Sequence, residues 1–340
     1  MFSSFRSTCR ALFFFPAFTA SALLAQTAID DVHITPRETL APASLAAATG
    51  GPGLIAKLEA GGIIRTSVDL VLVPVSITDD LHRPIIGLDR DNFQLFEGKK
   101  PQEIKNFSSE DTPVSIGILV DTSGSMAYKL DWAHEAVIQF CDAANPQDEF
   151  FMITFADAPQ LATDFTMRPE QVENDLLTAH SKGTTSLLDA IYMAVRKMRN
   201  ARYARKALLI LSDGGDNHSR YSEHDVRAAV KESDVAVYSV GIFDHYVNTE
   251  EERLGPELLR SVSEITGGTS FTLNRPNDMP LVTRAIGTQL RHQYMLAYQP
   301  QVASHDGKWR KISVKLRLPK SLRTAFFHVG ARPGYYPSGE

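Results

Sequence analysis

This sequence has little cysteine and no excess of positive charge. Two cysteines among 340 residues are too few for a disulfide framework. The formal net charge is -5, from 35 Lys and Arg against 40 Asp and Glu, and this balance gives no basic surface for nucleic acid. Hydrophobic residues make up 43% and charged residues 22%, proportions that exclude a wholly disordered or fibrous chain. The sequence therefore predicts a globular protein that depends on its apolar core.

A long hydrophobic run is missing as well. The apolar stretch at residues 11–24 is short for a membrane span, which needs about 20 residues. It follows two arginines and ends in small residues, the pattern of an export signal cleaved after Ala25 or Ala28. An uncleaved membrane anchor is the alternative. We therefore predict a signal peptide at residues 1–25 and an exported protein (periplasmic, cell-surface or secreted) with no stable membrane span after cleavage. Only Cys141 would survive, so no internal disulfide is expected.

Composition changes twice before residue 111. Residues 26–65 are rich in Ala, Gly, Thr and Pro and predict a disordered linker. Residues 66–110 predict an N-terminal β-segment. Its first strand lies around residues 71–77, where both faces are apolar. A hairpin is expected near residues 97–99, followed by a short strand at residues 104–107.

A different rhythm runs through residues 111–291, where short apolar strands alternate with amphipathic helices. This alternation predicts a doubly wound α/β unit with a mostly parallel, Rossmann-like sheet and helices on both faces. Pro169 and Pro256 stand where first-turn prolines belong. The predicted strands are 114–120, 150–155, 207–211, 235–242 and 269–273. The predicted helices are 130–143, 169–179, 187–198, 222–233, 256–265 and 280–290.

Residues 292–340 return to a strand pattern, with predicted strands at 294–298, 312–318 and 326–331. Two or three strands alone are marginally stable in water, and the β-segment at 66–110 has the same difficulty. The simplest solution pairs the two segments into one small β-domain. The α/β unit would then be inserted between its halves.

One short polar run carries the chemistry. Asp121-Thr122-Ser123-Gly124-Ser125 directly follows the apolar strand at residues 114–120. A carboxylate and two hydroxyls at alternate positions form a hard-oxygen cluster that suits a small divalent cation. A second apolar strand ends at Asp213, and a hydroxyl-rich loop at residues 183–186 opens a helix. Because ligands of open α/β sheets bind beyond the carboxyl ends of the strands, Asp121 and Asp213 are expected at one site.

Together these segments resemble the von Willebrand factor type A domain and its metal-ion-dependent adhesion site. The family pattern is D-x-S-x-S, then a Thr in a glycine-containing loop, then an Asp that ends a later strand. The resemblance covers most of residues 113–290, and the flanking segments resemble exported bacterial proteins related to this family. The resemblance implies a metal site formed by Asp121, Ser123, Ser125, Thr185 and Asp213. Thr184 is the alternative to Thr185 as the threonine ligand.

The family also implies a function. Its Ser and Thr hydroxyls bind Mg²⁺ directly or through water, its aspartates balance the charge, and the last ligand is an acidic side chain from a partner protein. We therefore expect a divalent cation (Mg²⁺, or Mn²⁺ or Ca²⁺), since hard-oxygen sites overlap in affinity. The expected function is an exported, adhesion-type protein-binding module, without catalysis and without nucleic acid.

Other interpretations stay open. The D-x-S-x-S run alone is also typical of a helix-capping turn. An aspartyl-phosphate hydrolase with Asp121 as nucleophile is the enzyme alternative, but such enzymes place a second carboxylate where this chain has Ser123. A structural envelope protein with a vestigial metal site is the third possibility. Asp189, Asp216 and Asn217 are expected to shape loops rather than bind metal.

Overall fold

The computed structural model describes residues 55–58, 62–65, 70–243, 250–273, 275–300, 308–317 and 327–337. The predicted signal peptide and most of the predicted linker lie outside these residues. Within that linker the structure forms an antiparallel hairpin of β1 (Ile55–Leu58) and β2 (Gly62–Arg65). The prediction of disorder was wrong for these two strands. Each contains isoleucine, which favours extended backbone, and the bias toward Ala, Gly, Thr and Pro around them hid this signal.

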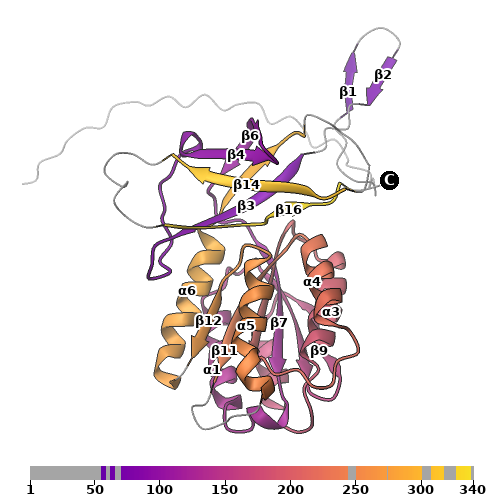
Figure 1. The fold of residues 1–340 in the computed structure, drawn as a ribbon, viewed down its shortest axis with the longest axis vertical. Coiled ribbons are helices and arrows are strands. Elements are labelled where there is room, and N and C mark those ends of the chain that lie inside the picture. Colours follow the sequence, from indigo (N-terminus) through magenta and orange to yellow (C-terminus); the bar gives the residue numbers. More distant parts are fainter. Residues whose placement is uncertain are drawn as a thin grey trace, which may run out of the picture. The chain divides into compact units, whose positions relative to one another are not determined.

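The α/β unit is built on a six-stranded sheet in the order β12-β11-β10-β7-β8-β9 (Figure 1). All neighbouring pairs are parallel except β8 and β9. β9 was not predicted, because it is a largely exposed edge strand with little apolar alternation. The bounds are β7 (Val114–Asp121), β8 (Glu149–Phe155), β9 (Pro159–Thr166), β10 (Arg205–Ser212), β11 (Val235–Ile242) and β12 (Ser270–Leu273).

Helices cover both faces of this sheet, as predicted. One apolar core joins the strands to α1 (Leu130–Asp142), α2 (Pro169–Leu177) and α6 (Met279–Arg291). The other joins them to α3 (Leu187–Lys197), α4 (Glu223–Glu232) and α5 (Glu250–Glu264). Short 3₁₀ turns are η1 (Arg90–Asn92), η2 (Gly124–Met126), η3 (Met198–Asn200) and η4 (Pro276–Asp278). None of the helices in the described residues is long and apolar enough to cross a membrane.

The structure confirms only one of the two predicted first-turn prolines. Pro169 begins α2, as predicted. Pro256 lies inside α5, which begins at Glu250, so the prediction of a helix start there was wrong. A proline inside a helix removes one backbone hydrogen bond, and α5 continues through it.

The β-domain consists of two four-stranded sheets, in the orders β15-β3-β13-β6 and β16-β14-β4-β5. Strands from before and after the α/β unit pair directly: β3 with β13 and β15, and β4 with β14. The predicted insertion of the α/β unit between two β-segments is therefore confirmed. The bounds are β3 (Val71–Thr78), β4 (Phe93–Glu97), β5 (Lys100–Gln102), β6 (Ile104–Ser108), β13 (Tyr294–Tyr298), β14 (Arg310–Leu316), β15 (His328–Ala331) and β16 (Gly334–Tyr335).

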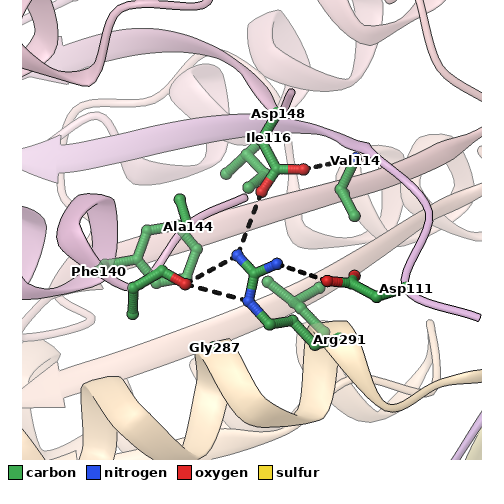
Figure 2. A pocket seen from close by; sticks show the side chains of 10 residues that line it. Asp111, Val114, Ile116, Phe140, Ala144, Asp148, Gly287 and Arg291 are labelled. Carbon is green, nitrogen blue, oxygen red and sulfur yellow. Dashed lines mark hydrogen bonds and ion pairs between the residues drawn. The ribbon is translucent and has the colours of Figure 1, made fainter. Parts of the chain in front are cut away.

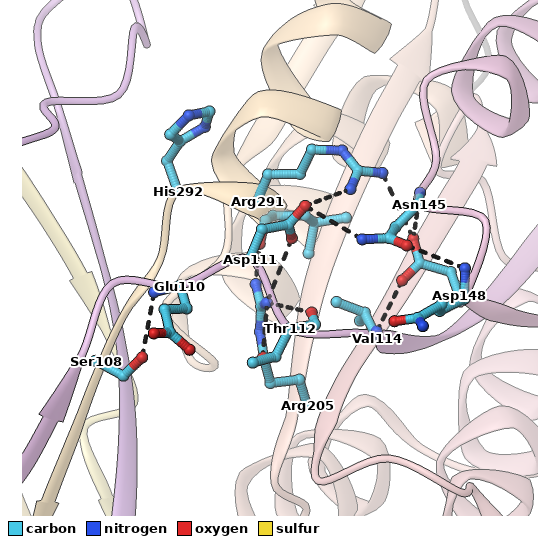
Figure 3. A network of polar contacts seen from close by, with 12 residues as sticks. Ser108, Glu110, Asp111, Thr112, Val114, Asn145, Asp148, Arg205, Arg291 and His292 are labelled. Carbon is cyan, nitrogen blue, oxygen red and sulfur yellow. Dashed lines mark hydrogen bonds and ion pairs between the residues drawn. The ribbon is translucent and has the colours of Figure 1, made fainter. Parts of the chain in front are cut away.

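A polar network joins the two places where the chain crosses between the β-domain and the α/β unit (Figure 3). Arg291, the last residue of α6, lies 2.8 Å from Asp111 and 3.6 Å from Asp148, and its guanidinium also donates to the carbonyl oxygen of Ala143. Arg205 at the start of β10 pairs with Asp111 at 3.8 Å. The segment that enters the α/β unit is thereby tied to the helix that leaves it.

Candidate metal centre

Asp121 is the last residue of β7, a strand that is buried along its whole length. Its carboxylate therefore lies at the carboxyl end of the parallel sheet, where such folds bind ligands. Oδ1 accepts a hydrogen bond from the backbone N–H of Ser123 at 2.9 Å, and Oδ2 accepts one from the Ser212 hydroxyl at 2.6 Å. Ser212 reaches it because β10 pairs in parallel with β7, with Leu211 opposite Val120. Neighbouring strands thus hold the orientation of this carboxylate.

Two serine hydroxyls follow Asp121 on the same loop. Ser123 is buried and Ser125 is exposed, and their Oγ atoms lie 3.1 Å apart. The loop is fastened to the next one by backbone hydrogen bonds. Gly124 N–H donates to the Gly183 carbonyl at 3.1 Å, and Lys182 N–H donates to the Thr122 carbonyl at 2.9 Å. The structure therefore places these serines beside the loop that carries Thr185.

Thr185 is buried and is held through its backbone. Its N–H donates to Asn217 Oδ1 at 2.9 Å, and its carbonyl accepts from the N–H groups of Asn217 and His218. Within the described part of the chain, its hydroxyl has no hydrogen-bond partner. The alternative residue, Thr184, donates its hydroxyl to Asp157 Oδ1 at 2.6 Å. Of the two threonines, Thr185 is therefore the one whose hydroxyl is available to a ligand.

Asp213 follows β10 directly and is also buried. Its Oδ2 accepts a hydrogen bond from Lys129 Nζ at 3.1 Å, and its Oδ1 accepts one from Gly215 N–H at 3.4 Å. The loop passes tightly against α5, where a Cβ atom on Gly255 would come within 2.3 Å of the Asp213 carbonyl oxygen. Gly214 beside it has φ of +77°, a conformation that favours glycine. This position of Asp213 therefore depends on two glycines.

The electrostatics of the site favour an added cation. Burial, and then the negative charge of Asp213, raise the pKa of Asp121 to about 7. Two carboxylates and three hydroxyls form a hard-oxygen donor set that suits a small divalent cation. In the described residues no group of three or more His, Cys, Asp or Glu could hold a metal ion, so any cation here needs the hydroxyls. The residues present fit such an ion.

Nearby acids shape the loops, as the sequence predicted. Asp189 Oδ1 accepts hydrogen bonds from the backbone N–H groups of Arg220 and Tyr221. Asp216 Oδ2 accepts one from Leu188 N–H at 3.2 Å. Both carboxylates are therefore engaged in ordering the segment after Asp213.

Sequence reasoning missed two residues of this site, Lys129 and Ser212. Ser212 precedes Asp213 and becomes significant only through the pairing of β10 with β7, which brings its hydroxyl within hydrogen-bond distance of Asp121. Lys129 lies in an ordinary polar stretch before α1, and its contact with Asp213 spans 84 positions. Only the parallel register could have indicated Ser212, and nothing local indicated Lys129.

The chain is similar to several known proteins. A family profile described as von Willebrand factor type A domain matches residues 116–215. Inter-alpha-trypsin inhibitor heavy chain H4 of Bos taurus is 24% identical over 168 residues, which cover 44% of this chain and 18% of that protein. Its Homo sapiens counterpart is 25% identical over 135 residues, which cover 35% of this chain and 14% of that protein. The chain thus spans less than a fifth of the length of these curated relatives.

Among solved structures, a von Willebrand factor type A protein from Catenulispora acidiphila is similar, with a TM-score of 0.46 and 13% identity over 76% of this chain and 72% of that one. The family match at residues 116–215 runs from β7 past Asp213 and so includes all the predicted site residues. The α/β unit of this chain is therefore a von Willebrand factor type A domain.

Proposed function

We propose that this chain is an exported binding module that holds one divalent cation and uses it to bind an acidic side chain of a partner protein. The proposed ligands are Asp121, Ser123, Ser125, Thr185 and Asp213. Mg²⁺ is the proposed ion, with Mn²⁺ and Ca²⁺ as substitutes. The observation that carries the proposal is the meeting of two buried carboxylates with the hydroxyls of two hydrogen-bonded loops at the carboxyl end of the sheet.

The chain's own residues would prepare the site in three ways. Hydrogen bonds from Ser123 N–H and Ser212 hold the carboxylate of Asp121. Asn217 fixes the backbone of Thr185. Ser125 is exposed and leaves the site open to solvent on its side. When bound, the cation supplies the positive centre to which a partner carboxylate oxygen attaches.

The exposed rim of the site supports an acidic protein partner. Tyr128, three residues after Ser125, is 94% exposed, and exposed aromatic side chains are frequent anchors in protein interfaces. Lys182 is exposed, and the side chain of Arg220 is 87% exposed. Both belong to loops that carry proposed ligands, and their positive charge would attract an acidic surface and speed association.

A phosphohydrolase is the less favoured alternative. Ser123 occupies the position where such an enzyme would need a second carboxylate as acid and base. Its hydroxyl instead contacts Ser125. We therefore propose binding rather than catalysis, and turnover of a phosphate ester by the purified chain would contradict this.

Calorimetric titration of Mg²⁺ and Mn²⁺ into the full chain tests the proposal. Wild type should bind one ion, and Asp121→Ala and Asp213→Ala should lose that binding while retaining the circular dichroism spectrum of the fold. Asp164→Ala is the matched control, because Asp164 is an exposed acid on β9 that pairs with Lys197; it should bind like wild type. A wild-type chain that binds neither ion would contradict the proposal and favour a structural protein with a vestigial site.

A further inference from the structure

A buried lysine lies inside the proposed metal centre. The side chain of Lys129 is 6% exposed, and its Nζ lies 3.1 Å from Oδ2 of Asp213, whose side chain is 1% exposed. Across the described residues, this is the single ion pair formed by either of the two buried acids of the site. The ion pair with one carboxylate offsets the free energy lost when this ammonium group is buried.

Lys129 is fixed by the same loop that carries the serines. Its backbone N–H donates to the Met126 carbonyl at 2.8 Å, and its own carbonyl accepts from the N–H groups of Trp132 and Ala133 at the start of α1. The side chain then crosses from this loop to Asp213 on the loop after β10. An ammonium held in this way at a buried site interacts with a bound cation far more strongly than an exposed one, which water and salt screen.

The formal charges of the site show what this lysine changes. Asp121 and Asp213 together would neutralise a divalent cation, so a partner carboxylate would add an uncompensated negative charge to a largely buried site. With the ammonium of Lys129 included, the site loaded with a divalent cation carries one net positive charge. A single carboxylate from outside then brings the sum to zero. Buried charges are tolerated when they are balanced, and the charge of the ion must be counted with the rest.

We propose that Lys129 determines the charge of the ligand: it weakens binding of the bare cation and makes the loaded site select a carboxylate. This rests on the proposed function, since it assigns ligand choice at the same site to a residue that is not a ligand. Lys182 and Arg220 on the rim are exposed, so they steer a partner toward the site but contribute little to this balance.

The test compares the affinity for Mn²⁺ in sodium chloride and in sodium acetate of equal ionic strength, with acetate as the carboxylate probe. In chloride, Lys129→Met should bind Mn²⁺ about tenfold more tightly than wild type, because a like charge has been removed close to the ion. In acetate, wild type should bind Mn²⁺ more tightly than in chloride, since acetate occupies the loaded site. This gain should be absent from Lys129→Met.

Three further variants separate charge from structure. Lys129→Gln keeps an N–H donor toward Asp213 but loses the charge, and should behave like Lys129→Met. Lys129→Arg keeps the charge and should retain the acetate response. Lys99→Met removes an exposed lysine of the β-domain, away from the loops of the site, and should match wild type in both salts. Circular dichroism with and without Mn²⁺ verifies that each variant is folded.

Two results would overturn the inference, and they are distinguishable. If wild type binds Mn²⁺ while Lys129→Met and Lys129→Gln keep its affinity and its acetate response, Lys129 has no role in ligand choice and the proposed function still stands. If wild type binds no Mn²⁺ in either salt, the proposed function fails and this inference fails with it.

Discussion

The two ends of the central sheet both bury charge, but they balance it differently. At the amino end, Asp111 and Asp148 face Arg205 and Arg291, two acids with two guanidinium groups. The side chains of Arg205 and Asp148 are 7% and 4% exposed. Each guanidinium also donates to backbone carbonyl oxygens, Arg205 to Thr112 and Leu290 and Arg291 to Ala143. At this end, each acid therefore faces at least one guanidinium group.

At the carboxyl end, Lys129 pairs with Asp213, and among the described residues Asp121 forms no ion pair. The negative charge of Asp213 contributes to the raised pKa of Asp121. The two carboxylates therefore repel each other in the folded chain. The amino end shows that this fold can pair its buried acids with an equal number of cations. The imbalance at the other end supports the cation site that we propose there.

The amino end has a structural task that explains its full pairing. Arg291 and Asp148 lie at the wall of a small cavity whose other walls are largely apolar (Figure 2). There, the end of α6 meets the segment that enters β7. Buried ion pairs add little net stability but are costly to break by removing one partner. This network should therefore matter for folding and for the junction with the β-domain, and should not affect a ligand at the far end.

The largest effect is expected from a substitution that disrupts the balanced network at the amino end. Arg205→Met should lower the free energy of unfolding by about 3–5 kcal/mol, because it leaves the buried network without one of its cations. Urea denaturation in EDTA measures this. Arg260→Met is the control, since Arg260 forms only exposed pairs with Glu257 and Glu264 and should cost about 1 kcal/mol or less. The affinity of folded Arg205→Met for Mn²⁺ should equal that of wild type; a large loss would mean that the two ends are not independent.

The next largest effect is expected from a substitution at the unbalanced carboxyl end. Asp213→Asn should raise the dissociation constant for Mn²⁺ by about a hundredfold, because it removes a charge that directly or through water holds the ion. Calorimetry measures this, with Arg291→Met as the matched change at the other end. Retention of Mn²⁺ binding by Asp213→Asn, or its loss in Arg291→Met, would remove the distinction between the ends.

A smaller effect concerns pH. In the metal-free chain the pKa of Asp121 is about 7, against an ordinary value of 3.8. Between these two pH values the folded chain keeps a proton on Asp121, whereas the unfolded chain has lost it. The free energy of unfolding therefore falls as pH rises from about 4 to 7. Below about pH 4 both states are protonated at this residue and the loss is absent. We expect the free energy of unfolding in EDTA to fall steadily over this window. Asp121→Asn should remove that part of the pH dependence in parallel urea titrations; identical profiles for both proteins would contradict it.

The sequence was sufficient where the structure depends on local pattern. The buried strands β7, β10 and β11 are continuous apolar runs, and the residues at the ends of β7 and β10 follow from them. The edge strand β9 has little apolar alternation and was missed. The pairing of the β-segments was predictable because neither could bury its apolar face alone. Local pattern thus predicted most elements of the sheet and placed Asp121 and Asp213 at the ends of their strands.

What the sequence could not predict depends on contacts between distant residues. No local signal distinguishes Lys129, which is buried against Asp213, from Lys182, which is exposed. Likewise, Arg205 and Arg291 belong to different elements and meet at Asp111 only after the strands have paired. Charge balance is a property of the assembled ends of the sheet, and so is the difference between them.

The smallest expected effects come from adding one methyl group at each end. Gly255→Ala in α5 would place a Cβ 2.3 Å from the Asp213 carbonyl oxygen, too close without a shift of that loop. Gly287→Ala in α6 places its Cβ 3.7 Å from the Cβ of Ala143, an ordinary contact. Because alanine has a higher helix propensity than glycine, Gly287→Ala should be neutral or stabilise the chain by up to about 1 kcal/mol.

Gly255→Ala gains the same helix propensity but must displace Asp213, so we expect a net loss of about 1 kcal/mol. Its Mn²⁺ affinity should fall by about threefold to tenfold, while that of Gly287→Ala stays unchanged. Thermal unfolding with and without Mn²⁺, together with calorimetry, measures both quantities. Because the two substitutions are chemically identical, a shift in metal affinity confined to Gly255→Ala would assign the effect to the loop of Asp213. Equal affinities in the two variants would mean that this loop adjusts freely and that its tight packing against α5 does not position the ligand.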